Sequence, residues 1–136
     1  MVCTYCSSET DVINSRLQKR ANSVWRRRKC KDCNRLFTTI EQVDYEKSWV
    51  VQYADESLRS FQREKLFLSL YKSLQHRPDA AQDAINLAAT ATGRIQHFYQ
   101  HGIITSTAIA TVCLEMLQRF DKAAAISYQA FHGDVL

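Results

Sequence analysis

The sequence predicts an α+β protein in which a small N-terminal β unit, held together by a metal, precedes a mainly helical domain. Three observations support this prediction. Two Cys-x2-Cys pairs lie within the first 33 residues, in a segment with short β-prone runs and almost no helical periodicity. After residue 65, apolar residues recur at three- and four-residue steps, as on one face of an α-helix. The length of 136 residues suffices for one ordinary domain or two small ones.

The cysteine spacing predicts a structural zinc site. Cys3 and Cys6 form one pair and Cys30 and Cys33 the other, with 23 residues between the pairs. Four thiolates complete the tetrahedral shell of one Zn²⁺ and leave no position for water, so the metal is expected to be structural. A binding free energy of roughly 10–16 kcal/mol would then become folding free energy for a segment with little core of its own. Two disulfides, or a chance occurrence of the two cysteine pairs, are the alternatives, and iron is a minor alternative metal.

No feature of the sequence indicates export. No segment is apolar and long enough to span a bilayer, and no signal-peptide hydrophobic region opens the chain. We therefore expect a cytoplasmic protein with no membrane partner. A reducing cytosol favours metal-binding thiols over disulfides. The fifth cysteine, Cys113, lies in an apolar helical stripe and is expected to be an inert core residue.

The β unit is expected to occupy residues 1–40 as a zinc ribbon. Runs at residues 11–13, 23–25 and 36–40 predict an outgoing, a returning and a final strand around the two cysteine pairs. The polar residues 41–48 are predicted to form a hinge-like linker.

Charge is divided unequally along the chain. Residues 1–40 contain nine basic and three acidic residues, a net charge of +6, whereas residues 41–136 have a net charge of −2. Much of the excess lies in the run 26–29 (Arg-Arg-Arg-Lys), which leads into the second cysteine pair. Arginine grips phosphate and reads the edge of guanine, so this run indicates a nucleic-acid-binding surface. A solvated charge run is the alternative, and the run by itself does not separate DNA from RNA.

Side chains alternate between the two faces of a strand. Arg26 and Arg28 are therefore expected to share one face of the returning strand. Arg27 and Lys29 are expected to share the other face. Arg16, on the preceding strand, joins either set according to the register.

The second domain, residues 49–136, is expected to open with a β-hairpin made from residues 49–53 and 58–61. Three amphipathic helices follow, the second capped by Asp79 and the third by Thr105 or Ser106. A fourth, weaker helix is predicted from residue 121 to about residue 131, ending at Gly133. The apolar stripe of the second helix is expected to comprise Ala84, Ile85, Ala88, Ala91, Ile95, Phe98 and Tyr99.

Several motifs follow one another along almost the whole chain. They are Met1-Val2-Cys3-x2-Cys6, Val12-Ile13-Asn14-Ser15-Arg16, Arg26-Arg27-Arg28-Lys29-Cys30-x2-Cys33-x3-Phe37-Thr38-Thr39-x-Glu41, Phe61-x-Arg63-Glu64-Lys65-Leu66 and Arg77-Pro78. Together they resemble the NrdR family, bacterial transcriptional repressors of ribonucleotide reductase genes. A zinc ribbon alone would not continue in this way.

The resemblance implies a zinc ribbon that binds double-stranded DNA at paired operator boxes, followed by an ATP-cone, which is a nucleotide-sensing module. It implies ATP and dATP as regulatory ligands, assembly into a homo-oligomer, and no catalysis, so we expect no enzyme. The metal ligands are expected to be Cys3, Cys6, Cys30 and Cys33. The DNA-binding residues are expected to be Arg16, Arg26, Arg27, Arg28, Lys29, Lys31 and Arg35. The nucleotide-binding residues are expected to be Val51, Gln52, Phe61, Gln62, Lys65 and Thr105.

The chain departs from the family pattern in its second domain. The ATP-cone strand normally reads Val-x-Lys, then a basic residue and Asp-Gly. Here Gln52 stands where a phosphate-binding lysine is expected, and Tyr53 follows it. Asn14 replaces an acidic residue and Trp25 an arginine. These departures keep an alternative open, namely a zinc-ribbon RNA-binding or scaffold protein whose helical domain no longer binds nucleotide.

Overall fold

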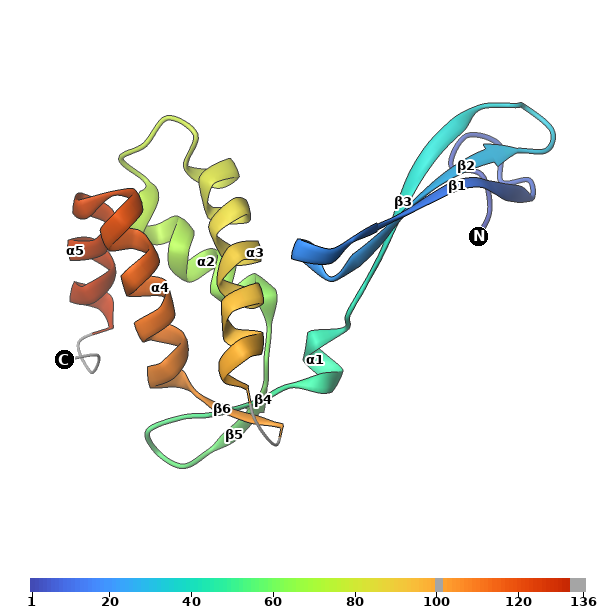
Figure 1. Cartoon of the computed structure of the whole chain (residues 1–136). Helices are drawn as coiled ribbons and strands as arrows, with labels where there is room; N and C mark the ends of the chain where they lie inside the picture. Colours follow the sequence, from blue (N-terminus) through green and yellow to red (C-terminus); the bar gives the residue numbers. More distant parts are fainter. Residues whose placement is uncertain (100–101, 133–136) are drawn as a thin grey trace. The chain divides into compact units, whose positions relative to one another are not determined.

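The computed structural model describes residues 1–99 and 102–132, and the chain divides into two compact units, Met1–Val43 and Asp44–Leu136. The first unit is β-structured and the second is mainly helical (Figure 1). This is the predicted α+β composition, with the β unit first. None of the described helices is both long and apolar enough to cross a membrane.

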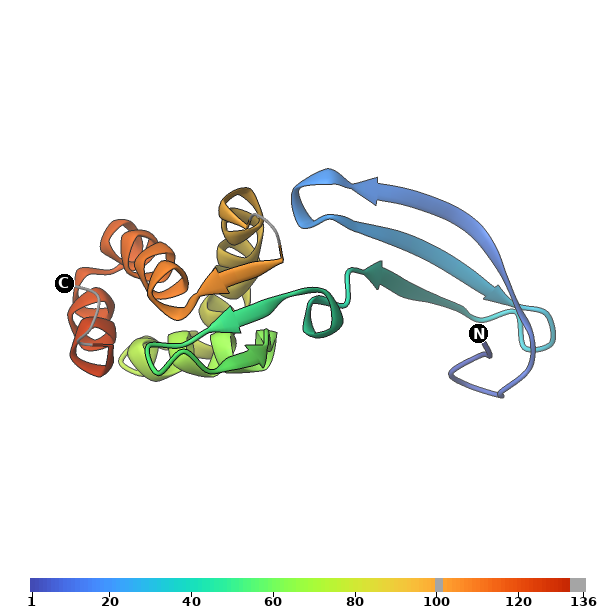
Figure 2. The ribbon, with the colours of Figure 1, turned by 90° about the horizontal axis from the view of Figure 1, so that it is seen from below.

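The first unit is a three-stranded antiparallel sheet with strand order β1-β2-β3. Its strands are β1 (Thr10–Gln18), β2 (Ser23–Cys30) and β3 (Leu36–Gln42). A 3₁₀ turn, η1 (Lys19–Ala21), joins β1 to β2 and ends at Asn22, whose positive φ of 45° suits asparagine. Figure 2 shows β1 and β2 as a long twisted hairpin with β3 after it. The strands are longer than the β-prone runs, because pairing extends through polar residues.

The second unit begins with a short helix, α1 (Tyr45–Ser48), and a small sheet. The sheet has the order β5-β4-β6, from β4 (Val50–Gln52), β5 (Leu58–Ser60) and β6 (Ile103–Thr105). The β4–β5 hairpin matches the prediction. The strand β6, which pairs in parallel with β4, was not predicted, because three residues before a helix carry too little pattern.

Four helices complete the second unit. They are α2 (Arg63–Leu74), α3 (Ala80–Phe98), α4 (Ser106–Phe120) and α5 (Lys122–Phe131). The helix α2 contacts α3 and α5, and α4 contacts the same two helices, so the four enclose one core. The sheet lies at one end of this group (Figure 1). The predicted end of α5 at Gly133 lies outside the described residues.

The segment 41–48, expected as a polar linker, is largely structured. Residues 41 and 42 complete β3, and Asp44 caps α1 by accepting a hydrogen bond from the Lys47 amide at 3.3 Å. Tyr45 is buried, with its ring centroid 4.4 Å from that of Trp49. This aromatic contact packs α1 against the rest of the second unit. The polar composition of the segment did not predict it.

Most of the predicted core positions are buried, but two positions of the α3 stripe are not. Phe98 is 67% exposed and Ile85 is 52% exposed, so the buried face of α3 is made mainly by its alanines and Ile95. A 19-residue helix needs only a narrow apolar stripe where its neighbours approach closely, and alanine permits that approach.

One of the two helix-cap predictions is confirmed and the other is not. Thr105 caps α4, because its hydroxyl accepts from the Ala108 amide at 3.1 Å. Asp79 precedes α3 without a side-chain capping bond. Asp121 instead caps α5, accepting from the Ala124 amide at 3.0 Å.

Arg77, part of the Arg77-Pro78 motif, joins three helices. Its guanidinium donates to Asp83 at 2.7 Å and to Asp121 at 3.0 Å, and it lies 4.5 Å from the centroid of the Phe120 ring. The motif therefore has a structural role at the α2–α3 turn.

Candidate functional site

The four predicted metal ligands come together in the first unit. Their sulfur atoms all lie within 4.8 Å of one another, with 3.7 Å between Cys3 and Cys33 and 3.4 Å between Cys6 and Cys30. A tetrahedral zinc with Zn–S bonds of about 2.3 Å requires sulfur separations of about 3.8 Å. A disulfide requires about 2.05 Å, and all four thiols are free. The geometry fits a four-thiolate structural zinc.

The two cysteine loops have the same local build. The residue after the second cysteine of each pair has a positive φ, 62° at Ser7 and 58° at Asn34, which turns the chain back toward the sheet. The amide of Tyr5 donates to the sulfur of Cys3 and the amide of Cys33 to the sulfur of Cys30, each at 3.4 Å. Amide donors stabilise a thiolate, as metal binding requires.

Two of the predicted DNA-binding cations lie beside the cysteine loops and have partners there. Lys31 pairs with Glu9 at 2.8 Å and Asp11 at 3.7 Å, and the hydrogen bond with Lys31 lowers the pKa of the Glu9 carboxyl. The Arg35 guanidinium lies 4.9 Å from the ring centroid of Tyr5. These contacts join residues of the first cysteine loop to residues of the second.

Arg26 and Arg28 share one face of the sheet, as alternation predicted. Arg26 donates to Ser15 at 3.1 Å and forms an ion pair with Glu41 at 3.0 Å. Arg28 donates to Thr39 at 3.3 Å and to Thr10 at 3.5 Å. Each of these arginines therefore ties β2 to both neighbouring strands.

The opposite face carries Arg16, Arg27 and Lys29. The register resolves the position of Arg16, because it lies opposite Trp25, and Trp25 alternates to the same face as Arg27 and Lys29. All three side chains are exposed, and none of them forms a hydrogen bond or ion pair with any other residue among those the structure describes. Lys19 and Arg20, which the sequence-based set did not include, are exposed at the tip of the hairpin.

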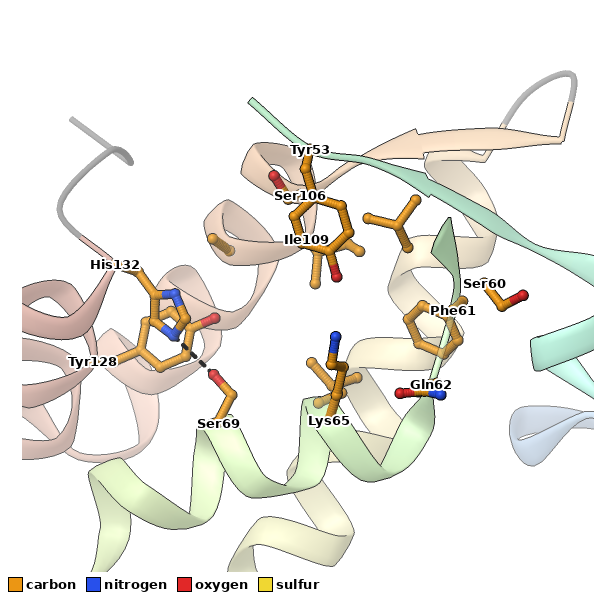
Figure 3. Close-up of a pocket in the computed structure, with 13 residues that line it drawn as sticks. Tyr53, Ser60, Phe61, Gln62, Lys65, Ser69, Ser106, Ile109, Tyr128 and His132 are labelled. Carbon is orange, nitrogen blue, oxygen red and sulfur yellow. Dashed lines mark hydrogen bonds between the residues drawn. The ribbon is translucent and has the colours of Figure 1, made fainter. Parts of the chain in front are cut away.

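The second unit contains a pocket of about 170 Å³ between the small sheet and the helices (Figure 3). Four predicted nucleotide-binding residues line it, namely Val51, Phe61, Gln62 and Lys65. Gln52 and Thr105 are not among its described lining residues, although their neighbours Tyr53 and Ser106 are. A cavity of about 150 Å³ holds one benzene-sized ring, so this pocket has room for a ring of that class.

The far wall of the pocket comes from α5, which the sequence-based set omitted. His132 Nε2 and Ser69 Oγ are 2.8 Å apart, and Tyr128 lies beside them (Figure 3). Burial, followed by the charge of Lys72, lowers the pKa of His132. Burial also raises the pKa of the nearby Cys113 thiol to about 12, consistent with an inert core cysteine. Helical periodicity does not predict that these residues line a pocket, because it does not show which helices pack against one another.

A three-stranded sheet joined to two Cys-x2-Cys loops defines the first unit as a zinc ribbon. A sequence profile for the N-terminal domain of NrdR-like transcriptional repressors matches residues 1–41. Over 135 residues the chain is 31% identical to the transcriptional repressor NrdR of Acidobacterium capsulatum, covering 98% of this chain and 79% of that protein. The NrdR proteins of Finegoldia magna and Streptococcus uberis are 29% and 28% identical, over 98% and 97% of this chain and 89% and 80% of those proteins. The chain belongs to the NrdR family of transcriptional repressors.

Proposed function

We propose that this protein represses ribonucleotide reductase genes by binding paired operator boxes in double-stranded DNA, under the control of ATP and dATP. In this proposal residues 1–40 bind DNA, residues 49–136 bind nucleotide and self-associate, and residues 41–48 connect them. We further propose that it acts in the cytoplasm and catalyses no reaction. The observation that carries the proposal is the cationic face of the four-cysteine ribbon, whose Arg16, Arg27 and Lys29 side chains have no partner among the described residues, in a chain of a repressor family.

The cationic face has the chemistry that duplex DNA requires. Arg16, Arg27 and Lys29 have no competing carboxylate partner among the described residues, so phosphates can take their hydrogen bonds without breaking existing ones. A β-ribbon fits the major groove, where arginine pairs with guanine. Arg26, Arg28, Lys31 and Arg35 support this surface through their contacts within the ribbon, so we propose that they act on DNA binding mainly by holding it in shape.

The pocket supports the nucleotide part of the proposal. Lys65 projects into it from the first turn of α2, where the helix dipole also favours an anion (Figure 3). Trp49 connects the pocket to α1, since its ring centroid is 5.2 Å from that of Phe61 and 4.4 Å from that of Tyr45. Packed aromatic side chains therefore connect the pocket to α1, the segment that leads to the ribbon.

Self-association would set DNA affinity by linkage. Two ribbons held in one oligomer bind paired boxes with an effective concentration that a single ribbon lacks, so a nucleotide that changes assembly changes affinity without altering any base contact.

The test is binding to DNA carrying paired or single boxes from ribonucleotide reductase promoters, over a range of salt, with no nucleotide, ATP or dATP. We expect a steep salt dependence, a preference for paired boxes, and a shift in affinity with nucleotide. Identical curves with and without nucleotide would reject the regulatory part, and equal affinity for random DNA would reject the operator part.

The absence of lysine at position 52 favours a second candidate, a zinc-ribbon RNA-binding or scaffold protein without a nucleotide ligand. Calorimetry with ATP and dATP separates the two candidates. An absence of binding heat at millimolar ligand, together with tighter binding to single-stranded RNA than to duplex DNA, would favour the second.

A further inference from the structure

Arg59, in β5, lies on the pocket side of the small sheet. It pairs directly with Val51 of β4 in the antiparallel register, so the two side chains leave the same face of the sheet. Val51 lines the pocket, and so does Phe61, two residues beyond Arg59. The register therefore places Arg59 on the pocket side of the sheet, where its side chain is exposed and lies outside the described lining of the pocket.

Gln52 lies on the other face of the same sheet. It pairs with Leu58 of β5 and with Thr105 of β6. Alternation directs these three side chains away from the face of Val51, and Leu58 is 58% exposed. A cation for the pocket must consequently come from another position than residue 52.

Tyr53 lies close to two cations. Its ring centroid lies 5.0 Å from Arg59 Cζ and 5.8 Å from Lys65 Nζ, both within the range of a cation–π contact. Tyr53 itself lines the pocket, and Figure 3 shows the Lys65 side chain pointing toward its ring. The same aromatic ring thus contacts both cations.

Arg59 remains available to a ligand. The Asp55 carboxyl in the hairpin turn already accepts hydrogen bonds at Oδ1 from the Ser57 amide at 3.0 Å and the Ser57 hydroxyl at 2.6 Å. These bonds lower the pKa of Asp55 more than the charge of Arg59 does. Among the described residues, no carboxylate lies within ion-pair distance of Arg59, and its side chain is exposed.

We propose that Arg59 is a phosphate-binding residue of the pocket and that, with Lys65, it clamps the polyphosphate chain of the bound nucleotide. This inference rests on the proposal that the pocket takes adenine nucleotides. A guanidinium donates two parallel hydrogen bonds to a phosphate, whereas a lysine acts as a single point charge. The pair would supply positive charge from the face of Val51, which the side chain of residue 52 does not share.

Calorimetry on the full-length, zinc-loaded protein tests the inference with ATP, ADP and adenosine. The variants are Arg59→Ala, Arg59→Lys and a matched control, Arg119→Ala, which removes an exposed arginine near the end of α4. Arg119 is 13 residues, or about 20 Å along the helix, from the pocket residue Ser106. Thermal unfolding of each variant verifies that the second unit is intact.

We expect Arg59→Ala to weaken ATP binding about tenfold or more, ADP binding less, and adenosine binding not at all, because only phosphates contact the guanidinium. Arg59→Lys should recover part of the ATP affinity, and Arg119→Ala should match the wild type for every ligand.

Two results overturn the role of Arg59 while leaving nucleotide sensing in place. One is unchanged ATP affinity in Arg59→Ala, and the other is an equal loss for ATP and adenosine, which indicates a structural role. A wild-type protein that binds none of the three ligands overturns the nucleotide part of the proposed function, and the inference with it.

Discussion

The ribbon and the helical unit differ in what they bury. In residues 1–43, all of which the structure describes, only Cys3, Ser23 and Cys30 are buried, and two of these three are cysteines of the metal cluster. In the second unit, buried apolar side chains come from all four long helices and from the small sheet. The stability of the ribbon therefore depends on the metal site, whereas the stability of the helical unit is distributed over many packing contacts.

This difference separates two roles within one chain. A sheet without an apolar core can leave both faces in water, so one face is free to carry unpartnered cations. A unit that must hold a pocket needs walls from several elements, and these walls need packing behind them. The following predictions test this contrast, from the largest expected effect to the smallest.

Loss of the metal should unfold the ribbon alone. Because zinc binding contributes roughly 10–16 kcal/mol to folding in such sites, Cys30→Ser or complete chelation should abolish the ordered ribbon while the helical signal in circular dichroism persists. Backbone amide NMR spectra of the full chain measure both units at once.

Cys113→Ser is the matched control, since Cys113 is buried in α4 away from the cluster. It should leave the zinc content unchanged. A ribbon that keeps its dispersed amide signals after complete chelation would show that its fold does not depend on the metal.

A cavity in the helical core should have the opposite distribution of effects. Leu70 is fully buried in α2, so Leu70→Ala should reduce the free energy of unfolding of the second unit by about 2–5 kcal/mol and leave zinc content unchanged. Leu68→Ala, on the exposed side of the same helix, should cost far less. Denaturant unfolding followed by helical signal measures both variants, and equal losses would show that α2 is not packed as described.

Arg28 and Arg27 should have different effects within the ribbon. Arg28→Ala removes hydrogen bonds to Thr10 and Thr39 and should destabilise the ribbon by about 1 kcal/mol per bond. Arg27→Ala should leave stability within about 0.5 kcal/mol but reduce the slope of log K against log salt for DNA binding by about 0.9. The reverse assignment of these two effects would show that the faces have been exchanged.

The smallest effect concerns pH. The pKa of His132 is lowered in the folded state, so the unfolded chain binds more protons and the second unit should lose stability as the pH falls through about 6.5. The pKa of Asp121 is also lowered, chiefly by the Ala124 amide and then by His76 and Arg77, but a carboxyl of this kind loses its contribution only below about pH 4.

Unfolding of the wild type and of His132→Gln between pH 7.5 and 5.5 isolates the histidine contribution. The variant should show a flatter dependence on pH over this interval. Equal slopes would assign the dependence to another group.

Sequence reasoning succeeded where the determinant is local. The spacing of Cys3, Cys6, Cys30 and Cys33 was sufficient to predict a cluster that the structure brings within 4.8 Å. The cap of α4 was predicted at Thr105 or Ser106 for the same reason, because a hydroxyl needs only the amide three residues later, and Thr105 forms it. Sequence reasoning failed for Phe98 and Ile85, whose exposure depends on which neighbour covers each side of α3.

The order of residues by itself determined the metal site, the positions of the helices and the alternation of the basic strand, because each depends on short-range spacing or on the period of one element. The tertiary structure decided which face Arg16 joins, the parallel pairing of β6 with β4, and the contact of Arg59 with the Tyr53 ring. These features depend on the register between strands and on the closeness of helices distant along the chain. Register and contact across such distances come from packing free energy summed over many residues, which no single motif encodes.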